Sequence, residues 1–344
     1  MKKNNFNFLR FYFAFIVIIG HLIEISGVKV FQPFAPFFST YISVTAFFCI
    51  SGFLITMSYQ TTPTLKAYFT KRAARLLPAY IFAILACTIF LSLASNYSLV
   101  EYFTHPQLFK YLAANLSFLN FIEPCLPGVF TSGNTFCAVN GALWTLKVEV
   151  SFYLAIPILL YFVNKIKRKY ILMIIIYVLS VVYRLAFDKL GELTESGIYT
   201  MLSRQLPGFL SYFICGIALY YYFDIFIQHK LKLLILGIIL FATERIIGIE
   251  ILSPLGLSLI VFSVAFSFEK LNSFAKHGDI SYGIYIFHFP VLQVIKSLGF
   301  FEKYNPYLVS IIFILTVLLI GYASWHLLEK KFLAKSKSIR IDLK

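Results

Sequence analysis

Long apolar segments alternate with short polar ones along the whole chain. Ten of these segments are candidates for crossing a bilayer, which takes about 20 residues of helix. They lie near residues 6–26, 38–59, 77–95, 141–163, 170–187, 200–222, 232–248, 252–268, 280–298 and 306–328. The third, fifth, seventh and eighth are short for this thickness, so we expect some of them to be tilted, kinked or re-entrant. The pattern predicts an all-α, polytopic membrane protein with about ten transmembrane helices.

Composition supports the membrane assignment. Of the 344 residues, 60% are hydrophobic and 13% are charged, and the mean hydropathy is +0.82. Soluble domains are about half apolar and about a quarter charged. The net charge of +15 would suit a nucleic-acid partner, but most Lys and Arg residues stand in short clusters between apolar segments. That placement is typical of membrane topology, so we expect contact with membrane lipid and no nucleic-acid partner.

The basic residues also predict an orientation. If the N-terminus is cytoplasmic, the inside segments collect 20 of the 30 basic residues, and both termini lie in the cytoplasm. These basic residues are Lys2, Lys3, Lys66, Lys71, Arg72, Arg75, Lys165, Lys167, Arg168, Lys169, Lys230, Lys232, Lys270, Lys276, Lys330, Lys331, Lys335, Lys337, Arg340 and Lys344.

The stretch 96–140 bears on the predicted number of spans. Its segment LFKYLAANLSFLNFI, residues 108–122, would be an eleventh span by hydropathy. An eleventh span would invert every later segment and place Lys165 and its basic neighbours outside, against the positive-inside bias. We therefore interpret 96–140 as a long external loop that contains an interfacial or re-entrant helix.

The same loop holds two of the five cysteines. Cys125 and Cys137 stand among turn residues in PCLPGVFTSGNTFC and are candidates for a disulfide in an oxidising compartment. No cysteine spacing indicates a metal site. Because no repeat, low-complexity tract or long linker interrupts the chain, we expect residues 1–344 to form a single membrane-embedded domain.

The first apolar segment carries two polar residues at a helical spacing. Arg10 and His21 are eleven residues apart, which places them about 20° apart around a helix and about 16 Å apart along it. One interpretation is an Arg that snorkels to the surface and a His that is hydrogen-bonded in the packing. The other is functional, because burying such groups in lipid costs about 2.5–3.5 kcal/mol and they normally face a bundle interior.

A second cationic pair follows the second segment. Arg72 and Arg75 are three residues apart in KAYFTKRAARLLPAY, hence on one helix face at the predicted cytoplasmic edge. Such a pair can bind phosphate groups, because the planar guanidinium group of Arg offers forked hydrogen-bond donors. Ordinary positive-inside flanking charge explains the same pattern.

Two further apolar segments contain ionisable groups. Glu149 lies in ALWTLKVEVSFYL, and Lys147, two residues away, is on a different helix face. Glu149 therefore needs a partner on another helix, for which Arg10 or His21 is the economical choice. In the ninth segment His288 stands two residues before Pro290, where an opened helix ladder can leave a polar cavity.

Taken in order, these segments resemble the acyltransferase 3 family of bacterial membrane acyltransferases. The resemblance spans essentially the whole chain, and six motifs in sequence make it specific. They are Arg10 with His21, FFCISGFLI at 47–55, the Arg72 and Arg75 pair, LWTLKVEVSFYL at 143–154, ISYGIYIFHFPVL at 280–292 and the closing LLEKKF. In the second motif, we favour close packing around Gly52 over a nucleophilic role for Ser51.

The resemblance implies an O-acyltransferase of the bacterial cytoplasmic (inner) membrane. Its expected reaction moves an acyl group, usually acetyl from acetyl-CoA, to a sugar hydroxyl of a surface or lipid-linked polysaccharide such as O-antigen. Two departures from the pattern are Thr45 and Val150, where many members have acidic residues. Because Glu149 is retained, the two departures cast doubt only on a tuning role or an acceptor-specific role.

The residues fit that chemistry as follows. Arg72, Arg75 and Arg10 are candidates to hold the CoA phosphates at the cytoplasmic face. His21 is the candidate general base for the acceptor hydroxyl, or a nucleophile that carries the acyl group. Glu149 would orient His21 or stabilise its charged form, and His288 either assists the acceptor or is structural.

A transporter or flippase for a lipid-linked glycan or small anion is the alternative, because it would also place Arg, His and Glu inside a helix bundle. Many transporters are built from internal repeats, and the sequence shows no obvious repeat, which argues against this alternative. The sequence does not specify the acceptor sugar or the oligomeric state.

Overall fold

The computed structural model describes residues 4–248, 250–274, 276 and 278–338, and its regular structure is helical. The α-helices are α1 (Phe6–Ser26), α2 (Thr40–Gln60), α3 (Leu65–Phe90), α4 (Leu99–Thr104), α5 (Pro106–Leu116), α6 (Trp144–Lys165), α7 (Lys169–Thr194), α8 (Gly197–Ser203), α9 (Leu206–Tyr221), α10 (Phe223–Ile247), α11 (Ser253–Ala265), α12 (Ser281–Ser297), α13 (Phe300–Lys303), α14 (Pro306–Ser324) and α15 (Lys330–Ser338). The predicted all-α class is confirmed. Lys2, Lys3, Arg340 and Lys344, which contribute to the predicted inside charge, lie outside the described residues.

Every one of the ten predicted segments coincides with a helix. Within the described residues, seven helical segments are long and apolar enough to cross a membrane. They are Phe6–Ser26, Lys29–Gln60, Leu65–Ala94, Gly141–Lys165, Lys169–Thr194, Phe223–Ile247 and Pro306–Ala334. The other three predicted segments correspond to α9, α11 and α12, which have 16, 13 and 17 residues. The chain is therefore a multi-pass membrane protein.

Three of the four segments predicted to be short are long helices. The third, fifth and seventh correspond to α3, α7 and α10, with 26, 26 and 25 residues. The residues that lengthen them interleave charged or polar side chains with apolar ones, as in LKAYFTKRAARL before the third segment and FDIFIQHKL before the seventh. Each helix therefore continues beyond the apolar stretch by which it was recognised. The eighth segment, α11, is short as predicted.

The chain divides into two compact units. The first unit comprises Met1–Arg10, Tyr41–Tyr68 and Val148–Lys276, and the second comprises Phe11–Thr40, Phe69–Lys147 and His277–Lys344. As a result, α1, α3 and α6 each contribute residues to both units.

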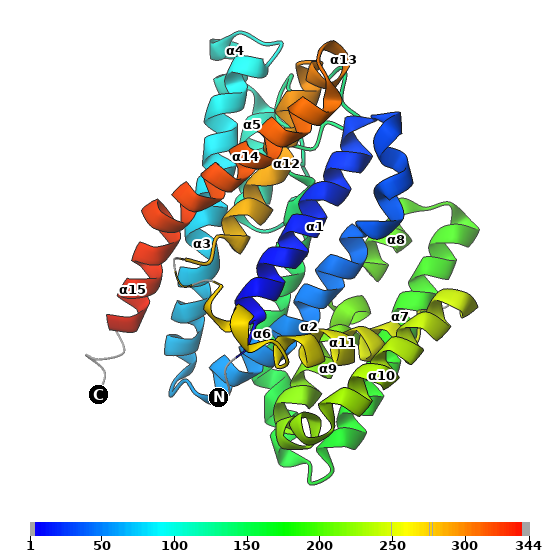
Figure 1. Ribbon diagram of the computed structural model, residues 1–344. Coiled ribbons are helices and arrows are strands. Elements are labelled where there is room, and N and C mark those ends of the chain that lie inside the picture. The colour runs from blue at the N-terminus through cyan, green and yellow to red at the C-terminus, as the bar shows by residue number, and fades with distance from the viewer. Residues whose placement is uncertain (1–3, 249, 275, 277, 339–344) are drawn as a thin grey trace. The chain divides into compact units, whose positions relative to one another are not determined.

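In the first unit, helices pack closely where glycine allows it. Figure 1 shows α10 and α11 side by side, and α7 packs against α9. A Cβ at Gly52 in α2 would lie 2.2 Å from the backbone oxygen of Phe213 in α9, and a Cβ at Gly216 would lie 2.2 Å from the oxygen of Cys49. The backbones of α2 and α9 are therefore in direct contact, as the sequence predicted for Gly52. Phe53, on the next position of α2, packs its ring against Phe262 of α11 at a centroid distance of 5.2 Å.

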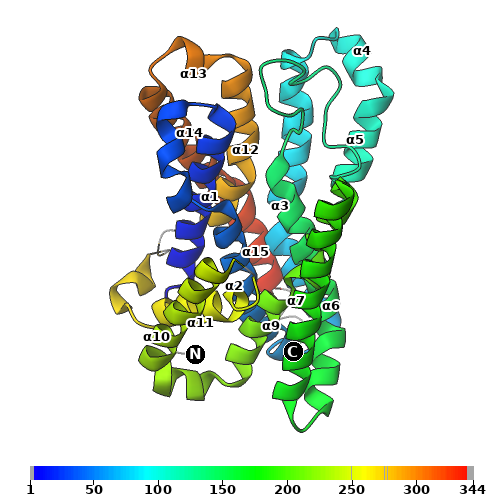
Figure 2. The same ribbon diagram turned by 90° about the vertical axis from the view of Figure 1, so that its right-hand side faces the viewer.

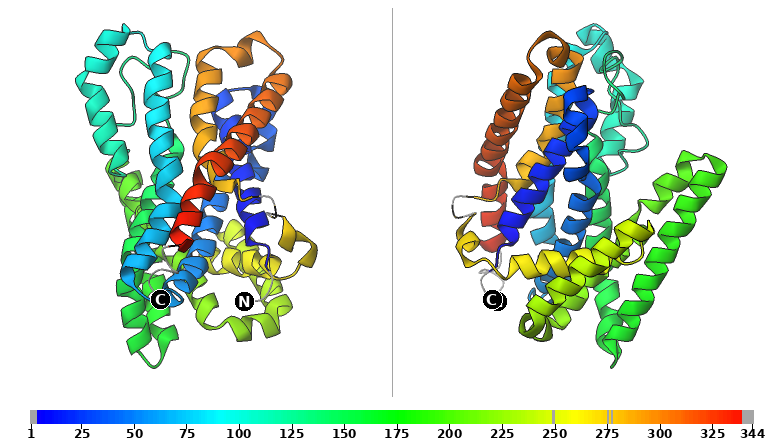
Figure 3. Two further views of the ribbon diagram at one scale, coloured as in Figure 1. Left: turned by 90° about the vertical axis from the view of Figure 1, so that its left-hand side faces the viewer. Right: turned by 45° about the vertical axis from the view of Figure 1, so that its right-hand side comes forward.

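In the second unit, α12 packs against α14. Figure 3 shows α14 (dark orange) crossing α12 (light orange). Gly283 and Gly321 lie at this crossing, where a Cβ on Gly283 would be 2.9 Å from the Cα of Gly321. The chain continues from α14 into a π-helical turn, Trp325–Glu329, before α15.

The stretch 96–140 lies in the second unit and contains α4 and α5. Figure 2 shows both beside one end of α3, and the Tyr80 hydroxyl in α3 donates to the Asn115 backbone oxygen of α5 at 2.7 Å. Helix α5 has 11 residues, too few to cross a bilayer. A disulfide joins Cys125 and Cys137, the pair that the sequence suggested.

Candidate active site

The second unit brings together two histidines from helices far apart in the chain. Nδ1 of His21 in α1 lies 2.7 Å from Nε2 of His288 in α12. The two rings are nearly parallel, with an interplanar angle of 10° and a centroid distance of 5.1 Å. His288 is completely buried, whereas His21 retains partial exposure. His21 is therefore the member of the pair that an entering molecule can reach.

A backbone carbonyl determines how protons are arranged on the pair. Nδ1 of His288 lies 2.6 Å from the backbone oxygen of Tyr285, which can only accept a hydrogen bond. This nitrogen therefore carries a proton, and in a neutral His288 the other nitrogen, Nε2, accepts from Nδ1–H of His21. In a neutral His21 the proton is then on Nδ1, and Nε2 presents an unshared electron pair. That atom is the one that can act as a base or nucleophile.

The residues around the pair restrict its movement. The ring of Phe289 meets the His21 ring edge-on, at a centroid distance of 5.3 Å and an angle of 85°. Tyr285, whose carbonyl fixes His288, also joins its hydroxyl to the Thr145 hydroxyl at 2.6 Å. Asn140 donates from its side chain to the Ile286 backbone oxygen at 2.8 Å. Residues just before α6 and in its first turn thus brace the part of α12 that carries His288.

A buried charge cluster lies elsewhere in the same unit. The Arg75 guanidinium in α3 pairs with Asp279 at 2.7 Å and with Glu329 at 3.4 Å. The side chains of Arg75, Asp279 and Glu329 are 15%, 13% and 1% exposed. Trp325 in the π-helical turn places its ring 6.0 Å from the guanidinium carbon. Two carboxylates therefore already surround the arginine that the sequence suggested for phosphate binding.

The remaining predicted site residues are placed as follows. Arg72 lies one turn before Arg75 in α3 and is partly exposed. Glu149 belongs to the first unit, where its carboxylate accepts a hydrogen bond from the hydroxyl of Tyr153 one turn later in α6. Arg10 lies in α1 and is also assigned to the first unit. The pairing of Glu149 with Arg10 or His21 stays a prediction.

The sequence analysis missed the buried and partly buried ionic interactions. One set is the pairing of Arg75 with Asp279 and Glu329, for which the signal included an acidic residue directly before the apolar run of α12. The other is Arg184, a buried arginine in α7 that forms an ion pair with Glu250 and bonds to the hydroxyl of Tyr41 in the first unit. The sequence feature that could have revealed Arg184 is its position as the single charged residue in the apolar run ILMIIIYVLSVVYRLAF.

Comparison with known proteins identifies the family of the chain. The sequence model of an acyltransferase domain matches residues 3–326. The chain belongs to the acyltransferase 3 family. The expectation drawn from the six motifs is thereby confirmed, and the histidine pair lies in a membrane acyltransferase.

Two relatives of this acyltransferase extend over nearly the whole chain. An O-acetyl transferase of Shigella phage Sf6 is 26% identical over 347 residues, covering 97% of each protein. Nodulation protein 10 of Rhizobium leguminosarum bv. viciae is 25% identical over 370 residues, covering 95% of this chain and 92% of the relative. No solved structure matches the acyltransferase.

Proposed function

We propose that this membrane acyltransferase is an O-acetyltransferase, which moves acetyl from cytoplasmic acetyl-CoA to a sugar hydroxyl of a surface or lipid-linked polysaccharide such as O-antigen. The observation that carries the proposal is the hydrogen-bonded pair of His21 and His288, which leaves one basic nitrogen on the accessible histidine. The similarity to a phage O-acetyl transferase supports acetyl as the transferred group.

In the proposed reaction, His21 is the general base. Its Nε2 takes the proton of the acceptor hydroxyl while the hydroxyl oxygen attacks the thioester carbonyl carbon of acetyl-CoA. The new C–O bond forms, the C–S bond breaks, and the proton passes from His21 to the departing CoA thiolate. The products are the sugar acetate and free CoA thiol.

In this reaction His288 is a positioning residue. While His21 holds the transferred proton, both of its nitrogens are donors, and Nδ1–H still donates to His288. The bond from His288 to the Tyr285 carbonyl keeps the acceptor nitrogen of His288 in place. The arrangement therefore supports both the neutral and the charged form of His21 without moving a proton through His288.

For the acyl donor, we propose Arg72 and Arg75 as ligands of the CoA phosphates, as the sequence suggested. Arg75 has two carboxylate partners, so it would bind phosphate only by sharing its donors with them. Arg10 as a further phosphate ligand and Glu149 as a catalytic carboxylate are included as the sequence suggested, and Arg10→Met and Glu149→Gln test them. The proposed setting is a bacterial inner membrane, with ten spans, both termini in the cytoplasm and the 96–140 loop outside.

The decisive experiment measures O-acetyl groups on the surface polysaccharide of host cells by NMR or mass spectrometry. Cells would express the intact protein, His21→Ala or the control His229→Ala, which changes an exposed histidine of α10. General-base catalysis contributes about 10²- to 10⁴-fold, so His21→Ala should abolish detectable acetylation at equal membrane abundance, and the control should retain it.

A companion assay separates the alternatives in membranes. The intact protein should release CoA thiol from acetyl-CoA when acceptor is present. Radiolabel that stays on the protein without acceptor, and disappears in His21→Ala, would identify His21 as a nucleophile instead. Unchanged acetylation in His21→Ala cells, or movement of glycan without thiol release, would overturn the proposal.

A further inference from the structure

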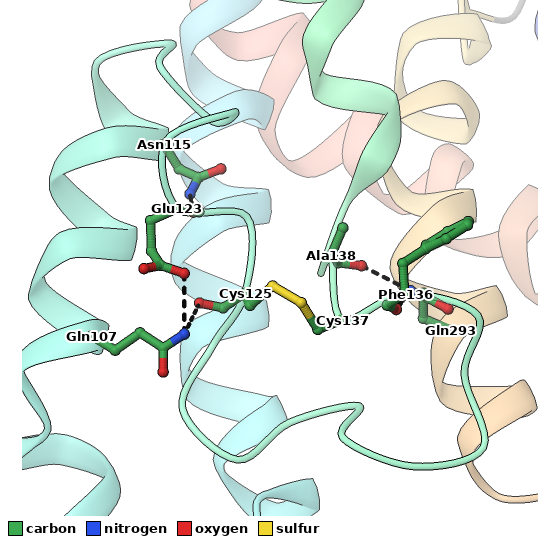
Figure 4. The surroundings of a disulfide bond; sticks show 8 residues. All are labelled: Gln107, Asn115, Glu123, Cys125, Phe136, Cys137, Ala138 and Gln293. Carbon is green, nitrogen blue, oxygen red and sulfur yellow. Dashed lines mark hydrogen bonds between the residues drawn. A yellow bond between two sulfur atoms is a disulfide. The ribbon is translucent and has the colours of Figure 1, made fainter. Parts of the chain in front are cut away.

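The disulfide in the 96–140 stretch joins two separately anchored segments (Figure 4). On the Cys125 side, Gln107 of α5 donates to the Glu123 carboxylate at 3.1 Å, and Asn115 of α5 donates to the Glu123 backbone oxygen at 2.9 Å. The Cys125 side is therefore fixed to α5.

On the Cys137 side the anchor is Gln293 of α12, which is completely buried. Its side-chain nitrogen donates to the backbone oxygens of Phe136 and Ala138, at 3.0 and 2.8 Å. Its side-chain oxygen accepts from the side-chain nitrogen of Asn134 at 2.8 Å. The amide of one glutamine thus holds Asn134 and Phe136 of the disulfide-closed loop, and Ala138 directly after it, against the helix that carries His288.

Between these anchors, Phe136 reaches the histidine pair through one other ring. Its ring stacks on that of Phe289, with a centroid distance of 6.3 Å and an angle of 21°. Phe289 in turn meets His21 edge-on. On another side, a Cβ at Gly141 would lie 2.6 Å from the tip of the Phe289 ring. Phe289 is thus confined by the loop, by the backbone before α6 and by His21.

We propose that Phe136 is a positioning residue for the acyl transfer. Held by Gln293 and the disulfide, it fixes Phe289 against the ring of His21 and so sets the direction in which Nε2 of His21 points. The inference rests on the proposed role of His21 as general base. It adds that a loop far from α1 in sequence controls the geometry of this base.

The physical argument concerns a remaining freedom of His21. Its hydrogen bond to His288 fixes the position of Nδ1, but the ring can still tilt about that bond. The edge-on contact with Phe289 opposes this tilt, and aromatic contacts of this kind contribute about 0.5–1.5 kcal/mol beyond burial. Loss of Phe136 should therefore reduce turnover by about 2- to 10-fold.

The test compares Phe136→Ala with Phe136→Tyr and with a matched control, Phe121→Ala. Phe136 and Phe121 are 40% and 44% exposed, so both truncations remove a similar ring from the surface of the same stretch. Turnover, KM for acetyl-CoA, KM for the acceptor and thermal unfolding would be measured for each protein in detergent. The double variant Cys125→Ser/Cys137→Ser then tests the tether.

We expect Phe136→Ala to lower kcat by about 2- to 10-fold with both KM values and the unfolding temperature unchanged. Phe136→Tyr should restore kcat, and Phe121→Ala should match the intact protein. The double cysteine variant should lower kcat as Phe136→Ala does, with a lower unfolding temperature because the disulfide is lost. Gln293→Leu is the second variant for the tether if the cysteine variant does not fold.

Three results would overturn the inference. They are an unchanged kcat in Phe136→Ala, a rise in acceptor KM alone, which would make Phe136 an acceptor contact, and an equal loss in Phe121→Ala. If the intact protein transfers no acetyl group at all, the proposed function itself fails. The two failures are therefore distinguishable in one set of assays.

Discussion

Nδ1 of His21 and Nε2 of His288 are 2.7 Å apart, although 267 residues separate them along the chain. The contact joins α1 and α12, and the backbone carbonyl of Tyr285 completes it from within α12. Because the carbonyl accepts but cannot donate, it gives the pair a direction: the partly exposed His21 donates to the buried His288, which donates to the carbonyl. A single main-chain atom therefore determines which nitrogen of a neutral His21 is available for chemistry.

This direction predicts different effects of two replacements at His288. Glutamine can place its amide oxygen near the Nε2 position and still accept from His21, whereas asparagine is too short to do so and retains only the contact with Tyr285. We expect His288→Asn to lower kcat by about 10- to 100-fold, the range seen when partners that orient a metal-bound histidine are removed. His288→Gln should lose less, as measured by CoA thiol release at matched protein abundance.

Equal losses in the two variants would contradict the directional arrangement. His105→Ala is the control, because His105 caps α5 through Gln107 and does not contact the pair.

Removing Arg75 should destabilise the fold. Arg75→Met would remove the guanidinium that pairs with the buried carboxylate of Glu329 and the partly buried one of Asp279, and breaking a buried ion pair costs about 3–5 kcal/mol. We expect a lower unfolding temperature in detergent and partial recovery in Arg75→Met/Glu329→Gln, which removes one of the unpaired charges.

The control is Lys189→Met, which breaks an ion pair whose side chains are 64% and 68% exposed. It should change the free energy of unfolding by about 0–1 kcal/mol. Similar stability of Arg75→Met and Lys189→Met would refute the structural role of Arg75.

Arg72 should behave differently from Arg75. Hydrogen bonds to charged groups contribute about 1.5–3 kcal/mol, so Arg72→Met should raise KM for acetyl-CoA by about 10-fold or more with kcat unchanged. Arg72→Lys should recover part of the affinity, since it keeps the charge and loses the planar fork. Steady-state kinetics at varied acetyl-CoA concentration measures both. An unchanged KM would remove Arg72 from the proposed donor site.

Gly52 offers a test of the first unit. In Gly52→Ala the added methyl would lie 2.2 Å from the Phe213 backbone oxygen, and backbone atoms cannot turn aside as a side chain can. We expect α2 and α9 to be forced apart, with a loss of about 1–3 kcal/mol or more in the free energy of unfolding. In Gly197→Ala nothing lies within 4 Å of the new carbon, so stability should be retained or slightly increased. Thermal unfolding of both variants gives the comparison, and equal stability would exclude the close contact.

Much of the architecture follows from the sequence alone. The apolar segments determine where helices form, because in a bilayer the backbone must satisfy its own hydrogen bonds and a helix does so locally. All ten predicted segments are helical, and the pairing of Cys125 with Cys137 was suggested by their loop. The motifs also identified the family, since they depend on residue order and not on three-dimensional contacts. Helix lengths were less predictable, because charged and polar residues lower the hydropathy at the ends of α3, α7 and α10 without ending the helices.

Only the tertiary structure decided which polar groups meet. Hydropathy and spacing place His21 and His288 in apolar helices, but they carry no information on which faces of α1 and α12 pack together. The same limit applies to Arg75, which the sequence suggested for phosphate and which the fold pairs with Asp279 and Glu329. Helical periodicity is a local property, whereas partner choice depends on how side chains from distant helices fill a shared space.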